Sequence, residues 1–159
     1  MPDSRLKVHK ATAQLKNDHK NFKALFGKYM NLGDDEGDQK EDIFLMLKAE
    51  LSDHATVEEE LFYPAVRDVH HDDAEGMVQE AQEEHKIVKT LLEEMGSLDV
   101  GSVEFEAKMK VLKESVEHHA DEEESDLFPL FKKLPPIRQD EISEQMRDRK
   151  IELSEGDGE

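Results

Sequence analysis

Cysteine is absent from this chain of 159 residues. Its absence excludes disulfide scaffolds, zinc sites built on thiolates, iron–sulfur clusters held by cysteine, and thiol catalysis. Long hydrophobic runs are missing as well, since no apolar stretch approaches the ~20 residues that a membrane-spanning helix needs. The N-terminal sequence MPDSRLKVHK lacks the apolar centre of a secretory signal. We therefore expect a cytoplasmic protein that has no membrane partner.

Basic residues are scarce: 21 stand against 40 acidic residues, which gives a formal net charge of −19. Such a surface repels phosphate backbones and anionic lipids, so we expect no nucleic acid among the partners. It attracts cations such as ferrous iron, although solubility alone would explain the same excess of acid. Common enzyme motifs are missing too, namely GxGxxG, the P-loop, HExxH and a serine-nucleophile motif.

Apolar residues make up 36% of the chain, and they recur at helical spacing rather than at random. Disorder throughout the chain is excluded by this periodicity, and strand-like alternation of useful length is absent. The pattern predicts an all-α fold with four long helices, over residues 4–30, 38–64, 72–95 and 102–130. Side chains that suit helix N-caps precede three of them, namely Asp38, Asp72 and Ser102.

The consecutive prolines Pro135 and Pro136 should stop the fourth helical pattern. We therefore predict a four-helix bundle over residues 1–134, followed by a short C-terminal helix and an acidic tail over residues 135–159. The short helix is expected over residues 137–153, and the last six residues are expected to be disordered.

Two segments, in the second and fourth predicted helices, share one pattern. His54 is followed by Glu58 four residues later and by a proline ten residues later, and His119 is followed by Glu123 and a proline at the same spacings. A histidine and a carboxylate four residues apart lie one above the other on a helix face. Imidazole and carboxylate together are ligands for iron, manganese or zinc.

Two further histidines, His19 and His85, lie on the inward stripes of the first and third predicted helices. A buried carboxylate without a partner costs of order several kcal/mol, so the two inward glutamates need compensation. A pair of metal ions would supply it, and histidines hydrogen-bonded to glutamates are the alternative. One set of residues per helix favours a dinuclear metal site inside a four-helix bundle, with these candidate ligands: His19, His54, Glu58, His85, His119 and Glu123.

The kind of metal follows from the ligands. Four imidazoles and two carboxylates, divided over two ions, leave coordination positions that bridging carboxylates, a bridging oxygen and a small ligand can fill. This pattern suits iron that binds or activates dioxygen, and manganese is an alternative. Structural zinc fits poorly because it prefers a closed tetrahedral site.

The chain resembles the hemerythrin-like proteins known as the HHE cation-binding domain, over roughly residues 4–133. The resemblance rests on four motifs taken together: Asn17-Asp-His19, His54-Ala-Thr-Val-Glu58-Glu-Glu-Leu-Phe-Tyr-Pro64, Glu83-Glu-His85-Lys-Ile-Val-Lys89, and His119-Ala-Asp-Glu-Glu123 with Leu127-Phe-Pro129. It implies an up-down-up-down four-helix bundle with a non-haem di-iron centre. Carried over, His19 and His54 would bind one iron, His85 and His119 the other, and Glu58 and Glu123 would bridge them.

The chain departs from the family pattern on the third helix. The oxygen-carrying hemerythrins of marine worms have a pair of histidines four residues apart there, whereas His85 has Ala81 four residues before it and Lys89 four after it. Glu123 also stands where those proteins have an aspartate. One iron would therefore have fewer imidazoles and more room for water or another carboxylate, which argues against simple oxygen transport.

Three functions follow as hypotheses. The centre could bind or sense dioxygen or nitric oxide, or it could reduce peroxide or dioxygen with electrons from an external donor, or the protein could sequester and deliver iron. Two local alternatives stay open: His118 and Glu122 in place of His119 and Glu123, and a surface metal site in the loop of His70 to Asp73. The aromatic residues near the motifs are expected in the core, where they would also shield the site: Phe22, Phe26, Phe62, Tyr63 and Phe128.

Overall fold

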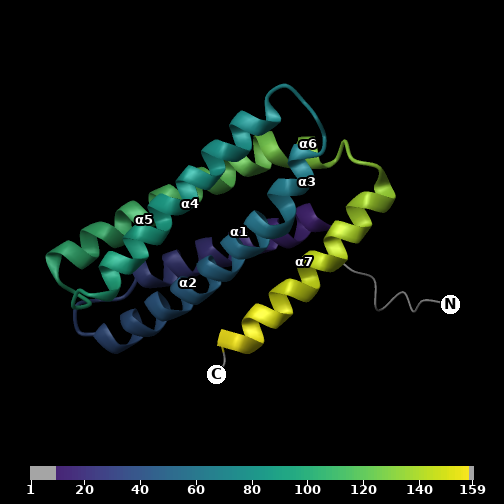
Figure 1. Cartoon of the computed structure of the whole chain (residues 1–159). Coiled ribbons are helices and arrows are strands. Elements are labelled where there is room, and N and C mark those ends of the chain that lie inside the picture. The colour runs from purple at the N-terminus through teal and green to yellow at the C-terminus, as the bar shows by residue number, and fades with distance from the viewer. Residues whose placement is uncertain (1–9, 158–159) are drawn as a thin grey trace.

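The computed structural model describes residues 10–157, and every regular element in that range is helical. Four long helices lie side by side and alternate in direction, as Figure 1 shows. They are α1 (Ala11–Met30), α2 (Gly37–Val57), α4 (Ala74–Gly96) and α5 (Val103–Glu122). The predicted all-α, up-down-up-down four-helix bundle is thereby confirmed, while the expected start of the first helix at residue 4 lies outside the described residues.

Of the three N-cap residues predicted from the sequence, one is confirmed by the structure. Ser102 caps α5, because its hydroxyl accepts a hydrogen bond from the backbone N–H of Phe105. The predictions for Asp38 and Asp72 were wrong. α2 begins one residue earlier, at Gly37, so Asp38 lies inside its first turn, where a carboxylate still suits the helix dipole. α4 begins at Ala74, so Asp73 occupies the cap position, without a side-chain hydrogen bond.

Two wide helical turns interrupt the second and fourth long helices of the bundle at equivalent places. α2 continues directly into the π-helical segment η2 (Glu58–Phe62) and then α3 (Tyr63–Arg67). α5 continues in the same way into η3 (Glu123–Leu127) and α6 (Phe128–Phe131). In each, a backbone N–H donates to the carbonyl five residues earlier, from Tyr63 to Glu58 and from Phe128 to Glu123.

Pro64 and Pro129 explain why the widening occurs there. Each lies in the first turn of the short helix that follows, where a residue without an N–H is tolerated. The result is a register shift of one residue, placed just before each proline.

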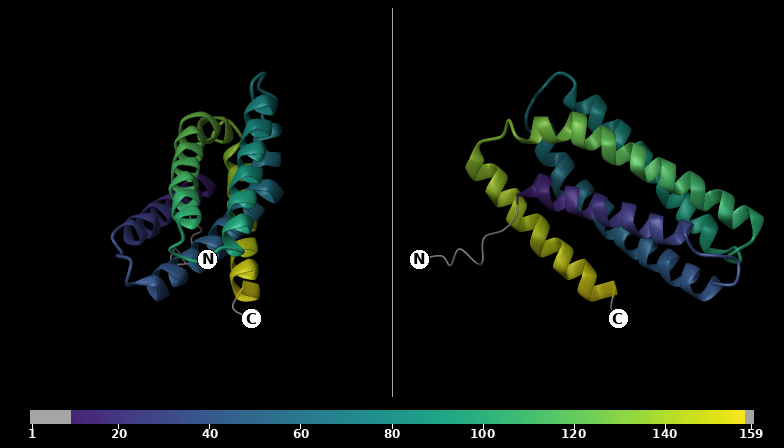
Figure 2. Two further views of the ribbon diagram at one scale, coloured as in Figure 1. Left: turned by 90° about the vertical axis from the view of Figure 1, so that its left-hand side faces the viewer. Right: turned by 180° about the vertical axis from the view of Figure 1, so that it is seen from behind.

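The C-terminal helix α7 (Pro136–Asp157) is longer than predicted. It begins with Pro136, whose fixed φ suits a first helical position, and it includes Ser154 to Asp157, which were expected to be disordered. Residues 158 and 159 lie outside the described range. α7 starts at the end of the bundle that holds α3 and α6 and runs back along α1 and α2 (Figure 2). It buries one stripe of side chains: Gln139, Ile142, Ser143 and Met146.

Two apolar clusters fill the bundle and leave its middle level to polar residues. One cluster surrounds Phe62 and Phe131, near α3, α6 and α7, and the other surrounds Leu47 and Phe105 toward the opposite end. No helix within residues 10–157 combines the length and the apolar character needed to span a membrane. The buried histidines and glutamates lie between these two clusters, so the rigid helices on both sides fix their positions.

Candidate metal centre

All six candidate ligands converge at the middle level of the bundle. They form two overlapping groups in which one ligand atom of each residue lies within 4.8 Å of those of the others. One group holds His19, His54, Glu58 and Glu123, and the other holds Glu58, His85 and His119. Five of the six side chains belong to buried residues, and His85 is half-buried.

The Nε2 atoms of the four imidazoles point inward, toward the two glutamates. Nε2 lies 3.1 Å from Glu58 Oε1 in both His54 and His85. The Nε2 atom of His19 lies 3.1 Å from Glu123 Oε1, and that of His119 lies 3.4 Å from Glu123 Oε2. Each glutamate therefore lies between one histidine of α1 or α2 and one histidine of α4 or α5.

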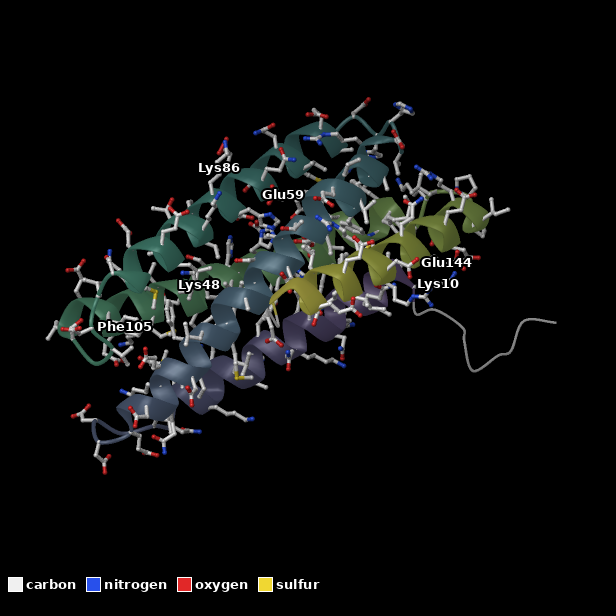
Figure 3. The ribbon with its side chains drawn as sticks, turned by 60° about the horizontal axis from the view of Figure 1, so that its bottom comes forward. Lys10, Lys48, Glu59, Lys86, Phe105 and Glu144 are labelled. Atoms are coloured by element: carbon white, nitrogen blue, oxygen red, sulfur yellow. The ribbon has the colours of Figure 1, made fainter. Side chains whose placement is uncertain are left out.

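The Nδ1 atoms point outward, and each donates to a carboxylate. The four contacts measure 2.7 to 2.8 Å and join His19 to Glu124, His54 to Asp18, His85 to Glu59 and His119 to Glu84. Because a carboxylate oxygen can only accept, each Nδ1 carries the proton, and the second nitrogen is aimed at the centre. Outer carboxylates of this kind orient the imidazoles that bind metal ions. Figure 3 shows Glu59 midway along the bundle, on the surface beside this cluster.

The wide turns η2 and η3 begin at the two inner glutamates themselves. A turn of this kind brings residues five apart onto one face of the helix. In η2 it directs the hydroxyl of Tyr63 back to Glu58, to which it donates over 3.2 Å. The regular helical spacing of four residues thus aligns His54 with Glu58, and the extra residue of the wide turn adds Tyr63 to the same site.

Tyr63 is the site residue that sequence reasoning placed among the shielding core aromatics. Its hydroxyl lies 3.0 Å from Glu123 Oε2, 3.1 Å from His85 Nε2 and 3.3 Å from His119 Nε2, so it reaches the centre directly. A signal was present in the repeated motif, because Tyr63 stands where the second copy has Phe128. Of these two equivalent residues, only Tyr63 has a hydroxyl group, and it lies beside the buried carboxylates.

The charges of the centre shift its acid–base properties. Burial lowers the pKa of His54, but the nearby charge of Glu58 and the bond to Asp18 outweigh it and raise that pKa to about 10. Burial is likewise outweighed at His119, where Glu123, Glu58 and Glu84 raise the pKa to about 12. The pKa of Glu58 falls well below its usual value, since the positive charge of His54 outweighs burial. Without metal, protons on these imidazoles neutralise the inner carboxylates.

The arrangement fits bound cations. Glu58 is fully buried, and its Oε2 atom has no hydrogen-bond partner within the described residues. The inward Nε2 atoms can present lone pairs once they lose their protons, because the outer carboxylates keep the protons on Nδ1. Imidazole nitrogens and carboxylates around one small volume are groups that bind metal ions in proteins.

A small cavity of about 40 Å³ adjoins the imidazoles. Its wall consists of the four histidines and apolar side chains, which are Phe22, Leu51, Ala55, Val88 and Val116. A second hollow, of about 50 Å³, lies beside Ala81 and reaches His119 and Glu123. Ala81 is one of the two places where the worm hemerythrins would carry the additional histidine, so the missing ligand leaves space for water or a small ligand.

The two local alternatives have different outcomes. The side chain of His118 is 66% exposed and pairs with Glu122 over 3.0 Å, while His119 faces the centre. His118 and Glu122 form a separate outer group with Glu84. In the loop of His70 to Asp73, His71 accepts a hydrogen bond from the backbone N–H of Asp73. Within residues 10–157, none of the side-chain groups that could hold a metal ion includes these residues.

Comparison with known proteins decides the family. The model of the hemerythrin HHE cation-binding domain matches residues 10–131. The chain belongs to this family. This hemerythrin-like protein also resembles a solved structure, that of a hemerythrin HHE cation-binding domain-containing protein from Mycobacterium kansasii. The two share 26% sequence identity and a TM-score of 0.79, over 92% of this chain and 88% of the other.

A curated relative carries a different name. The DNA nickase of Nostoc sp. (strain PCC 7120 / SAG 25.82 / UTEX 2576) is 32% identical over 118 residues. The alignment covers 74% of the hemerythrin-like chain but 32% of the nickase, so the chain spans about a third of that relative. The name describes the longer protein, and the expectation that this chain has no nucleic-acid partner stays a prediction.

Proposed function

We propose that this hemerythrin-like protein holds two iron ions at the six-residue centre and binds or senses a small diatomic ligand, dioxygen or nitric oxide. The observation that carries the proposal is the 40 Å³ cavity, which the four imidazoles line together with apolar side chains. A space of that size admits a diatomic molecule.

In this proposal His19 and His54 hold one ion, and His85 and His119 hold the other. Glu58 and Glu123 lie between the two pairs, so their carboxylates can serve both ions. The support is geometric: Glu58 Oε1 lies 3.1 Å from the Nε2 atoms of both His54 and His85, which belong to different pairs. Bound iron would supply open coordination positions and one-electron chemistry that the side chains lack.

The chain orients the imidazoles and gives the cavity an apolar lining. The outer carboxylates keep each Nδ1 protonated, which holds the ring planes and the inward lone pairs in place. Leu51, Val88 and Val116 form an apolar part of the cavity wall. The ring of Phe22 packs edge-on against His54, with centroids 5.2 Å apart, and leaves that imidazole little freedom.

A second function, reduction of peroxide, is favoured by Tyr63. Reduction of one hydrogen peroxide to two waters consumes two electrons and two protons; the electrons would come from the ferrous ions and, for turnover, from an external donor. The Tyr63 hydroxyl touches both inner glutamates and two imidazoles, so it can donate a hydrogen bond to a peroxide at the centre, while the two protons come from solvent. Burial and the charges of Glu58 and Glu123 raise the pKa of Tyr63, which keeps the hydroxyl protonated as a donor.

The optical spectrum of the anaerobically iron-loaded protein separates these functions. Reversible spectral changes with dioxygen or nitric oxide support binding, and sustained loss of added peroxide supports the enzyme. Iron uptake without a response to any of the three supports sequestration. Val88→Phe should fill the cavity and weaken ligand binding at least about tenfold while iron content is unchanged. Val103→Phe is the matched control, since Val103 is 89% exposed at the start of α5.

A further inference from the structure

The four outer carboxylates are not equivalent. Three of them reach the surface, with side chains that are 22% exposed in Glu84, 31% in Glu124 and 47% in Glu59. The side chain of Asp18, which accepts from His54, is only 10% exposed. A buried carboxylate loses its hydration and needs a positive partner close by.

Lys150 of α7 is that partner. Its ammonium pairs with Asp18 Oδ1, while the other oxygen, Oδ2, accepts from His54 Nδ1 over 2.7 Å. Within residues 10–157, no ion pair joins a lysine or arginine to any of the other three outer carboxylates. A continuous chain of contacts therefore runs from the C-terminal helix, through Asp18, to a candidate metal ligand.

α7 is held firmly enough to fix Lys150 in place. At its first half, the Ser143 hydroxyl accepts from the backbone N–H of Ala11 over 2.8 Å, beside the Lys10 and Glu144 side chains labelled in Figure 3. At its second half, Nε and Nη2 of Arg149 donate to the two carboxylate oxygens of Glu60 in η2, over 2.8 and 3.3 Å. The ammonium of Lys150 is thus presented by a docked helix rather than by a free tail.

Asp18 is linked to both histidines of the pair His19 and His54, to one by contact and to the other by sequence. Its carboxylate holds the His54 imidazole, and it directly precedes His19 in the chain. Among the residues that the structure describes, the other pair, His85 and His119, has no such link to α7. Lys150 lies outside residues 10–131, which match the family model.

We propose that Lys150 is a positioning residue of the metal centre, through which α7 sets the geometry and the affinity of the ion position held by His19 and His54. The inference rests on the proposed function, because it assigns these histidines to one metal ion. Lys150 fixes the plane of the Asp18 carboxylate, and that plane fixes the orientation of His54. The two ion positions are therefore unequal, and the C-terminal helix controls one of them.

The test compares three variants of the full chain. Lys150→Met removes the charge and keeps most of the length, Lys150→Arg restores a cation, and Arg149→Met is the matched control. Arg149 lies beside Lys150 and anchors the same turn of α7, but it contacts Glu60 rather than an outer carboxylate of a histidine. Loosening of α7 alone would affect Lys150→Met and Arg149→Met alike.

Two readouts are used. In the metal-free protein, NMR follows exchange of the His54 Nδ1 proton with solvent, which should be at least about tenfold faster in Lys150→Met, near the parental rate in Lys150→Arg and unchanged in Arg149→Met. In an anaerobic ferrous titration, Lys150→Met should weaken the binding of one of the two iron ions about tenfold, as expected for loss of an outer-sphere partner. Lys150→Arg should restore that affinity.

Equal exchange rates of the His54 Nδ1 proton in Lys150→Met and Arg149→Met would overturn the proposal. An equal loss of affinity for both iron ions in Lys150→Met would overturn it as well. If the parental protein binds no iron, the proposed function fails. The exchange of the His54 proton in the metal-free chain then still decides whether Lys150 positions that imidazole.

Discussion

Tyr63 and Phe128 occupy equivalent positions in the two copies of the repeated motif, yet they give the two halves of the centre different surroundings. The Tyr63 hydroxyl lies 3.1 Å from His85 Nε2, on the side of His85 and His119. The Phe128 ring stacks on the imidazole of His19, with centroids 6.1 Å apart and planes 7° from parallel. One half therefore has a hydrogen-bond donor within reach, and the other is faced by an apolar ring.

Tyr63→Phe tests the role of that hydroxyl. The hydroxyl donates to charged carboxylates in a buried site, so its loss should lower the free energy of unfolding of the metal-free protein by about 1.5–3 kcal/mol. In the iron-loaded protein it should slow peroxide reduction at least about tenfold. Chemical denaturation and peroxide consumption measure the two effects.

The control for this variant is Tyr29→Phe. The Tyr29 hydroxyl donates to Glu106 over 2.9 Å, in a part-buried position outside the metal centre. Its loss should reduce stability by about 0.5–3 kcal/mol and leave peroxide chemistry as in the parent. Equal peroxide rates in Tyr63→Phe and the parent would contradict the assigned role.

The choice between the adjacent histidines of α5 gives the next prediction. His119→Ala should abolish binding of the second iron, because His119 Nε2 faces both inner glutamates. His118→Ala should leave the iron content unchanged, since its imidazole pairs with Glu122 at the surface. Iron analysis of both purified variants decides the matter, and the reverse result would assign the site to His118.

Glu58→Ala should also abolish binding of the second iron. The carboxylate lies between histidines of both pairs, so its removal affects both ion positions. Glu59→Ala is a matched control from the same wide turn, since Glu59 contacts only the outer nitrogen of His85 among the centre's histidines. We expect Glu59→Ala to weaken iron binding about tenfold and to keep a stoichiometry of two.

Metal uptake should release protons. In the metal-free protein the pKa of His54 is about 10 and that of His119 about 12, so both imidazoles are protonated at pH 7. A metal ion needs their neutral forms, and loading at pH 7 should therefore release about two protons per chain into a weakly buffered indicator solution. Metal affinity should accordingly rise with pH above neutrality, and uptake without proton release would contradict this account.

The same pKa shifts determine how the metal-free fold depends on pH. The raised pKa of His54 means that its pairing stabilises the fold fully below the unfolded value of 6.5, and that this contribution is lost as pH rises through about 10. Glu58 acts in the opposite direction, because its lowered pKa adds stability above 4.5 that is lost on acidification.

The fold and the inner cluster were predictable because they depend on spacing. A histidine and a glutamate four residues apart must share a helix face, and periodic apolar residues then turn that face inward. His54 and Glu58 lie on one face as predicted, and all six candidate residues meet in the centre. Their role as ligands stays a prediction until metal binding is measured.

The parts that escaped prediction depend on tertiary context. The wide turn at η2 shifts the register by one residue and turns Tyr63 into the site, which a regular helical spacing does not indicate. Asp18 and Lys150 are 132 residues apart in the chain, so only the docking of α7 brings them together. The extension of α7 to Asp157 was missed for the same reason, because a charged helix gains most of its stability from the surface on which it packs.

The count of iron per chain, combined with Mössbauer spectroscopy of the oxidised protein, tests the central claim most directly. We predict two ferric ions per chain after anaerobic loading and oxidation, and a spectrum of magnetically coupled iron because Glu58 and Glu123 lie between the two histidine pairs. One isolated ion per chain, or none, would contradict a dinuclear centre built from these six residues.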